Sequence, residues 1–191
     1  MTRSTVFRFL PSALLPALLA AGFARAAEVR PVARIGFDFG GDNLITRPFA
    51  DGSSGSIRAN EGFWIGAGVL VSGSRSIEAE VTLAYKFAST TAGAGNVTWT
   101  RTPLDALAFY RLPRFRLGGG LTYHFAPQLQ GAGVASGATA KFDDALGWVL
   151  QADYVLTPRY ILGARYTDLT YKSGGVSFSG KGLGTTVGFV F

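Results

Sequence analysis

The last residues of the chain, Lys181 to Phe191, read KGLGTTVGFVF, and their pattern decides the fold. Successive side chains of a β-strand point to opposite faces of the sheet. In this stretch one face is small or weakly polar, with glycine at three positions. The other face is mainly apolar and carries Leu183, Thr185, Val187, Phe189 and Phe191. The alternation predicts a strand with one apolar face.

The same alternation recurs along the chain in about eight segments. They cover residues 32–41, 61–72, 76–88, 97–110, 115–125, 141–156, 160–172 and 181–191. Long connections (43–60, 89–96, 126–140 and 173–180) alternate with short turns (73–75, 111–114 and 157–159). This order predicts an all-β fold, an eight-stranded antiparallel transmembrane β-barrel with tight turns on one rim and long loops on the other. Pro103 cannot donate to a ladder and indicates a bulge within 97–110.

Residues 1–26 have the pattern of a secretory signal peptide. Arg3 and Arg8 precede an apolar stretch from Leu10 to Phe23, and Ala24-Arg25-Ala26 is a small-x-small cleavage site. The apolar stretch is too short and too interrupted by proline to span a membrane as a helix. We therefore expect a barrel domain covering residues 27–191, exported through the inner membrane.

Charge and composition exclude several classes of protein. Cleavage would remove three arginines, so the formal charge falls from +6 to +3, and no Lys/Arg cluster indicates a nucleic-acid partner. The chain has no cysteine, so disulfides and thiolate metal sites are impossible. It is nevertheless 48% hydrophobic and 13% aromatic. A barrel in contact with lipid uses apolar residues at every second position in this way.

Charged residues share the face opposite the bulky apolar residues. With the apolar face outward, the interior receives five cations and five anions, which we expect to form a charge network in the lumen. The cations are Arg34, Lys86, Arg101, Arg116 and Arg165, and the anions are Asp38, Glu78, Glu80, Asp105 and Asp153.

A soluble barrel or sandwich would turn these charges outward instead. Its interior would then have to hold several large apolar side chains from every strand, and an eight-stranded barrel is too narrow for them. Aromatic residues also gather near both ends of the strands, as expected for two girdles at membrane interfaces. The loop-side set is Phe63, Tyr85, Phe87, Tyr123 and Phe125; the turn-side set is Tyr110, Phe115, Tyr154, Tyr160, Phe189 and Phe191.

Three segments carry a resemblance to a known family. GWVLQADY at 147–154, Thr157-Pro158 and ARYTD at 164–168, followed by the terminal Phe191, resemble the small outer-membrane β-barrel superfamily of OmpA-, OmpX- and OmpW-like proteins. The resemblance implies a monomer in the outer membrane of a Gram-negative bacterium, in contact with lipid and lipopolysaccharide. It also implies that the barrel assembly machinery reads a signal containing Phe189 and Phe191.

The function predicted from these residues is structural or surface-interacting, without enzymatic activity or cofactor. Because an eight-stranded lumen has little free volume, we expect a salt-bridged interior with no open pore. One alternative is a narrow OmpW-like channel for small or apolar molecules, with Gly118-Gly119-Gly120 and Pro103 as possible weak points of the wall. The other is a lipid A-modifying enzyme, but His124-Phe125-Ala126 lacks the serine of the His-x-Ser pair found in lipid A deacylases. Asp143-Asp144 is more typical of solvated surface acids than of a metal site.

Overall fold

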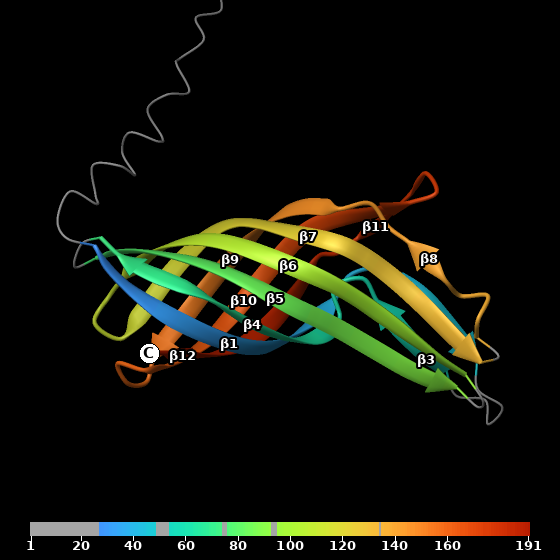
Figure 1. Cartoon of the computed structure of the whole chain (residues 1–191), viewed down its shortest axis with the longest axis horizontal. Coiled ribbons are helices and arrows are strands. Elements are labelled where there is room, and N and C mark those ends of the chain that lie inside the picture. Colours follow the sequence, from blue (N-terminus) through green and yellow to red (C-terminus); the bar gives the residue numbers. More distant parts are fainter. Residues whose placement is uncertain (1–26, 49–53, 74–75, 93–94, 134) are drawn as a thin grey trace, which may run out of the picture.

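The computed structural model describes residues 27–48, 54–73, 76–92, 95–133 and 135–191. The predicted signal peptide and the turn signal Asp51-Gly52 lie outside this part of the chain. Within the described ranges, no helix is long and apolar enough to cross a membrane. The described chain is built almost entirely of strands (Figure 1).

Eight long strands follow one another around a closed antiparallel ring. Neighbouring strands pair in chain order, and β12 returns to pair with β1. The eight are β1 (Glu28–Gly40), β4 (Gly62–Ser72), β5 (Ile77–Ala92), β6 (Gly95–Arg111), β7 (Phe115–Gly133), β9 (Ala145–Val155), β10 (Tyr160–Ser173) and β12 (Gly182–Val190). The predicted all-β fold and its eight strands are confirmed.

The connections differ from the prediction at the loop end of the ring. Residues 43–60, predicted as an irregular loop, contain the hairpin of β2 (Asn43–Pro48) and β3 (Ser54–Arg58). Two further short strands, β8 (Ala140–Lys141) and β11 (Val176–Ser179), extend the edges of β7 and β10. The loop predicted at 89–96 is wrong, because β5 and β6 continue through most of it as a paired ladder. Likewise β7 continues to Gly133, well into the predicted loop 126–140.

The irregularity expected at Pro103 lies beside it, and the extra residue belongs to the neighbouring strand. Pro103 pairs in register with His124, whereas the register of β6 and β7 shifts between Thr100 and Thr102. On β7 the extra residue falls near Ala126, whose φ is 45°. One additional residue moves all later side chains of β7 to the opposite face. Leu129 therefore points inward, although Phe125 points outward.

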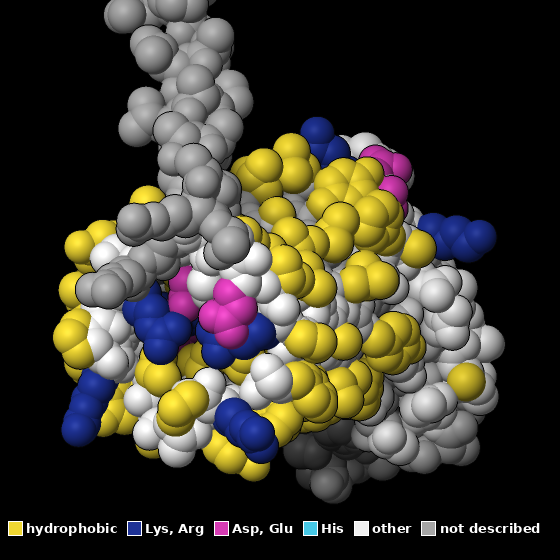
Figure 2. Space-filling view, turned by 60° about the vertical axis from the view of Figure 1, so that its left-hand side comes forward, with side chains coloured by type: hydrophobic (Ala, Val, Ile, Leu, Met, Phe, Trp, Pro, Cys, Tyr) yellow, Lys and Arg dark blue, Asp and Glu magenta, His cyan; other side chains and the backbone are white. Residues whose placement is uncertain are grey.

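The outer wall is apolar along most of the ring. Large apolar side chains are exposed on every ring strand, for example Leu83, which is 53% exposed, and Leu150, which is 55% exposed. Figure 2 shows this apolar wall together with the charged end of the barrel. Aromatic residues of the two expected girdles touch across neighbouring strands, in the pairs Phe63–Phe87, Phe115–Tyr154 and Tyr160–Phe189.

Beyond the loop-side girdle the polarity of the wall reverses. The ends of β5, β6 and β7 extend past Phe87 and Phe125, and their outward positions are polar (Ser89, Thr91, Asn96, Thr98 and Gln130). Their inward positions are mainly apolar and include Ala88, Val97, Trp99 and Leu129. The extension thus has the polarity of a water-soluble β-structure, whereas the wall below has that of a lipid-facing barrel.

The triple glycine 118–120 permits close approach of β6 and β7. A Cβ on Gly120 would collide with the carbonyl oxygen of Ala106 and the Cα of Leu107, both backbone atoms. The ladder continues without interruption through these residues on both sides. The glycines therefore pack the wall closely and leave no gap in it.

We expect Gly120→Ala to destabilise the barrel by about 1–3 kcal/mol, because the added methyl overpacks a rigid backbone contact. The measurement is the urea midpoint for loss of heat-modifiable gel migration in lipid vesicles. Gly137→Ala is the control, because a Cβ there meets nothing within 4 Å. Equal urea midpoints for the two variants would contradict the close contact between Gly120 and the backbone of Ala106 and Leu107.

Candidate functional site: the barrel interior

The interior of the ring is filled in three successive zones along the barrel axis. A network of ion pairs lies toward the short turns, beside a small apolar cluster of Val32, Leu70, Ile161 and Val190. A small polar chamber lies in the middle, and a larger apolar cluster lies at the loop end. Alternate residues of the strands build each zone, since every second side chain of a ring strand points inward. All ten charged residues predicted to face the lumen are buried, each being at most 6% exposed.

The first zone, called here the tight network, joins charged side chains from five strands. Arg116 on β7 donates to Glu78 at 3.1 Å, to Glu80 at 2.9 Å and to Asp153 at 2.7 Å. Arg34 on β1 forms a two-pronged pair with the carboxylate of Glu80. Bidentate guanidinium–carboxylate pairs fix geometry as well as charge.

The tight network is closed by further contacts on its margins. Arg34 also reaches Asp153 at 3.1 Å and the hydroxyl of Thr186 at 3.2 Å. Arg111, at the end of β6, donates to Glu78 at 2.6 Å. The network therefore sets three guanidinium groups against three carboxylates. Such a set is stable in a buried site only when each charge has partners, as here.

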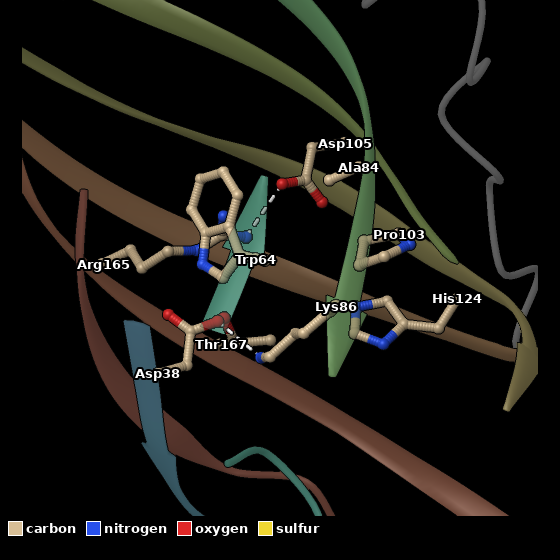
Figure 3. A pocket seen from close by; sticks show the side chains of 9 residues that line it. All are labelled: Asp38, Trp64, Ala84, Lys86, Pro103, Asp105, His124, Arg165 and Thr167. Atoms are coloured by element: carbon tan, nitrogen blue, oxygen red, sulfur yellow. Dashed lines mark hydrogen bonds and ion pairs between the residues drawn. The ribbon is translucent and has the colours of Figure 1, made fainter. Parts of the chain in front are cut away.

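The second zone, the chamber, is shown in Figure 3. Its walls carry two ion pairs, Lys86 to Asp38 at 2.5 Å and Arg165 to Asp105 at 2.9 Å. It has a volume of about 10 Å³ and is also lined by Trp64, Ala84, Pro103, His124 and Thr167. That volume accommodates about one water molecule.

The chamber walls differ from the tight network in how their polar atoms are bonded. Five buried atoms of the lining make no hydrogen bond to another described residue. They include both donors and acceptors: Trp64 Nε1, Arg165 Nε, Thr167 Oγ1, Asp38 Oδ1 and Asp105 Oδ1. Buried polar groups of this kind are usually satisfied by ordered water. The chamber is the polar and weakly bonded part of the interior.

Arg101 lies between the chamber and the loop end. Among the described residues it forms no ion pair, although we expected the five lumen cations and five anions to pair. Its guanidinium instead donates to the carbonyl oxygen of Glu61 at 2.6 Å and lies 5.1 Å from the centre of the Trp99 ring. Backbone oxygen and an aromatic face therefore take the place of a carboxylate.

The third zone, called the apolar cap, closes the loop end of the interior. Trp99 and Tyr171 are fully buried at its centre, with ring centres 5.2 Å apart. The hairpin β2–β3 contributes Ile57, and β7 contributes Leu129 from beyond its bulge. Trp99 Nε1 donates to the carbonyl oxygen of Ala59 at 3.0 Å, which fixes the hairpin base over the cap.

His124 faces the interior as predicted, and its hydrogen bond is to tyrosine. Its Nδ1 lies 2.6 Å from the hydroxyl of Tyr171, and both side chains are buried. A catalytic base needs a nucleophile within hydrogen-bond reach and access to substrate. Here the ring nitrogen instead joins the chamber to the apolar cap.

Asp143 and Asp144 have structural contacts between β8 and β9, after the third long connection. The carboxylate of Asp144 accepts a hydrogen bond from the backbone of Ala126 at 2.8 Å and another from the Tyr123 hydroxyl at 3.1 Å. It thereby satisfies the backbone exposed by the bulge in β7. Across the described residues no cluster of three or more His, Asp or Glu is placed to hold a metal ion.

The apolar cap contains the interior residues that the sequence reasoning missed. The signals were present: Val97, Trp99 and Arg101 alternate, and Leu44, Ile45 and Ile57 are apolar residues in an otherwise polar connection. Phe189 and Phe191, for which an assembly signal was predicted, lie at the turn rim. Phe191 is 66% exposed, and its backbone N–H donates to the carbonyl oxygen of Pro31 at 3.1 Å.

Comparison with known proteins identifies the fold. No protein-family model and no curated protein sequence matches the chain. Among solved structures, it is similar to Ail, the attachment invasion locus protein of Yersinia pestis, in complex with the heparin analogue sucrose octasulfate. That match has a TM-score of 0.54 and 11% identity, and it covers 86% of this chain and 99% of Ail. The Neisserial surface protein A, NspA, matches with a TM-score of 0.52 and 14% identity, over 87% of this chain and 100% of NspA.

We expect Arg116→Met to destabilise the barrel by about 3–5 kcal/mol, because it leaves three buried carboxylates short of a partner. The measurement is again the urea midpoint in lipid vesicles. Lys172→Met, on an exposed side chain at the loop end, is the matched control and is expected to change little. A midpoint for Arg116→Met as high as that of the control would contradict the described network.

Proposed function

We propose that this chain, which has the fold of the small outer-membrane β-barrel proteins, is an integral outer-membrane barrel with a closed, charge-lined interior and a structural or surface-interaction role. The reversal of wall polarity at the loop-side girdle is the observation that carries this proposal. It separates a band suited to lipid from a strand extension suited to water.

The filled interior supports a barrel without an open pore. The tight network, the chamber and the apolar cap lie one after another along the axis. Water or ions crossing the barrel would have to break buried ion pairs and then pass Trp99 and Tyr171. Each such step exposes or separates groups that are stable only together.

The surface role rests on the loop end of the molecule. There the ends of β5, β6 and β7 lie together with the hairpin β2–β3 (Figure 1). The outward positions of these strand ends are polar, so they form a polar platform. The names of Ail and NspA, an attachment protein and a surface protein, support the same role for this fold. Lipopolysaccharide would surround the loop-side girdle, and phospholipid the turn-side girdle.

Export and assembly complete the proposal. The sequence of residues 1–26 supports a signal peptide that is cleaved during export through the inner membrane. Phe189 and Phe191, at the turn rim, would be read by the barrel assembly machinery. Closure of the ring within one chain supports a monomer, since no strand edge of the ring is left to pair with another copy.

A narrow channel is the second candidate. A hollow on the outer wall beside Gly118 favours a channel over an enzyme. The hollow is lined in part by Gln151 and Arg165, whose side chains belong to the interior. His124, bonded to Tyr171, offers no comparable support for lipid A modification. Uptake assays with small apolar molecules test the channel, and mass spectra of lipid A test the enzyme.

We expect the wild-type protein to show no reproducible conductance in planar bilayers. A Glu80→Ala/Arg116→Ala variant, which removes the central ion pair of the tight network, should show frequent brief openings. Lys172→Ala serves as the control for purification and insertion. A stable large conductance of the wild type would contradict a closed interior and favour the channel.

A further inference from the structure

Three aromatic residues of the turn-side girdle have an arginine as their direct neighbour in the sequence. Aromatic rings of such girdles lie at the membrane interface, so a directly adjacent residue on the turn side lies at the level of the lipid headgroups. Three neighbouring pairs have this arrangement: Tyr110-Arg111, Arg114-Phe115 and Arg159-Tyr160.

Two of these arginines have no compensating acid. Arg114 and Arg159 are exposed and form no ion pair with any described residue. Other arginines of the same rim are compensated, in the pairs Arg30–Glu28 and Arg111–Glu78. Figure 2, in which this end of the barrel comes forward, shows basic side chains around the end beside the apolar wall. At the loop end the two signs of charge are equal in number (Arg58, Lys141, Lys172 and Lys181 with Asp42, Asp143, Asp144 and Asp168).

The backbone places Arg114 and Arg159 on the two sides of one strand, β9. The carbonyl oxygen of Arg114 accepts a hydrogen bond from Val155 at 2.9 Å, at the end of β9. Arg159 belongs to the turn from β9 to β10, and its carbonyl oxygen accepts from Val190 at 2.8 Å. Both arginines therefore have backbone groups bonded to neighbouring strands, and their side chains are exposed.

An apolar hollow lies on the outer wall over the same strands. It has a volume of about 400 Å³ and extends over β7, β9, β10 and β12. The small side chains of Ala152 and Ala164 pair there, beside a row of larger ones formed by Leu150, Tyr166 and Leu183. Its lower border, Leu117, is three residues from Arg114, or about 10 Å along the strand.

We propose that this part of the wall is a binding site for an anionic phospholipid of the turn-side leaflet. The headgroup phosphate lies between the guanidinium groups of Arg114 and Arg159, and one acyl chain lies in the hollow over Ala152 and Ala164. Arginine suits phosphate because its planar donors bind two oxygens at once. The proposal rests on the outer-membrane location proposed above.

Native mass spectrometry of the full chain, released from micelles that contain phosphatidylglycerol or phosphatidylcholine, tests the site. We expect the wild type to retain phosphatidylglycerol severalfold more than phosphatidylcholine. Arg114→Gln/Arg159→Gln should abolish that preference, whereas Ala164→Leu, which fills the hollow, should lower retention of both lipids. Lys141→Gln/Lys172→Gln removes two exposed cations from the loop end and should change neither.

Heat-modifiable gel migration of each protein shows whether the barrel has formed and separates this proposal from the previous one. A wild type that never forms an inserted barrel would overturn the proposed function and this site with it. A correctly inserted wild type that retains both lipids equally would overturn this site alone, since the hollow would then be a general contact for acyl chains. The same holds if the loop-end control loses the preference as fully as the arginine variant.

Discussion

Closure of the backbone hydrogen bonds into a ring is the constraint on which the rest of the structure depends. β12 pairs with β1 from Val190 to Gly182, so the last strand satisfies the first and the ring has no free edge. In a bilayer every backbone donor and acceptor must find a partner within the protein. Once the ring is closed, each strand has one inner and one outer face. Lipid or water outside the ring then determines which residues the outer face can carry. The narrow lumen determines which residues fit on the inner face.

The reversal of polarity along β5, β6 and β7 follows from this constraint. Below the loop-side girdle the outside is apolar, and the inside holds ion pairs that are shielded from lipid. Above it the outside is polar, and the inside holds Trp99 and Tyr171. One extra residue near Ala126 allows β7 to follow both patterns, and Asp144 bonds the backbone that the bulge exposes. The bulge thus joins a membrane barrel to a water-soluble cap without breaking the ladder.

Period-two alternation was enough to predict the ring and the burial side of residues such as Arg34 and Glu80. It could not predict their partners, because Arg34 meets Glu80 and Asp153 only across strands far apart in sequence. The loop end was harder for a physical reason. There the apolar face turns inward, so the lipid-facing pattern that identified the strands ends near Phe87, although the strand continues to Ala92. The hairpin β2–β3 is short, and only the facing pair Ile45 and Ile57 reveals it.

The reversal of polarity can be measured directly, because the chain has no cysteine and accepts single spin labels. Labels at Val81, Leu121 and Val187 in the apolar band should relax with oxygen, which dissolves in lipid, and should be shielded from a water-soluble nickel chelate. Labels at Ser89, Asn96 and Gln130 on the strand extension should show the opposite behaviour. Equal access of both relaxation agents to the two sets, or the reverse order, would contradict a wall that changes from lipid to water at the loop-side girdle.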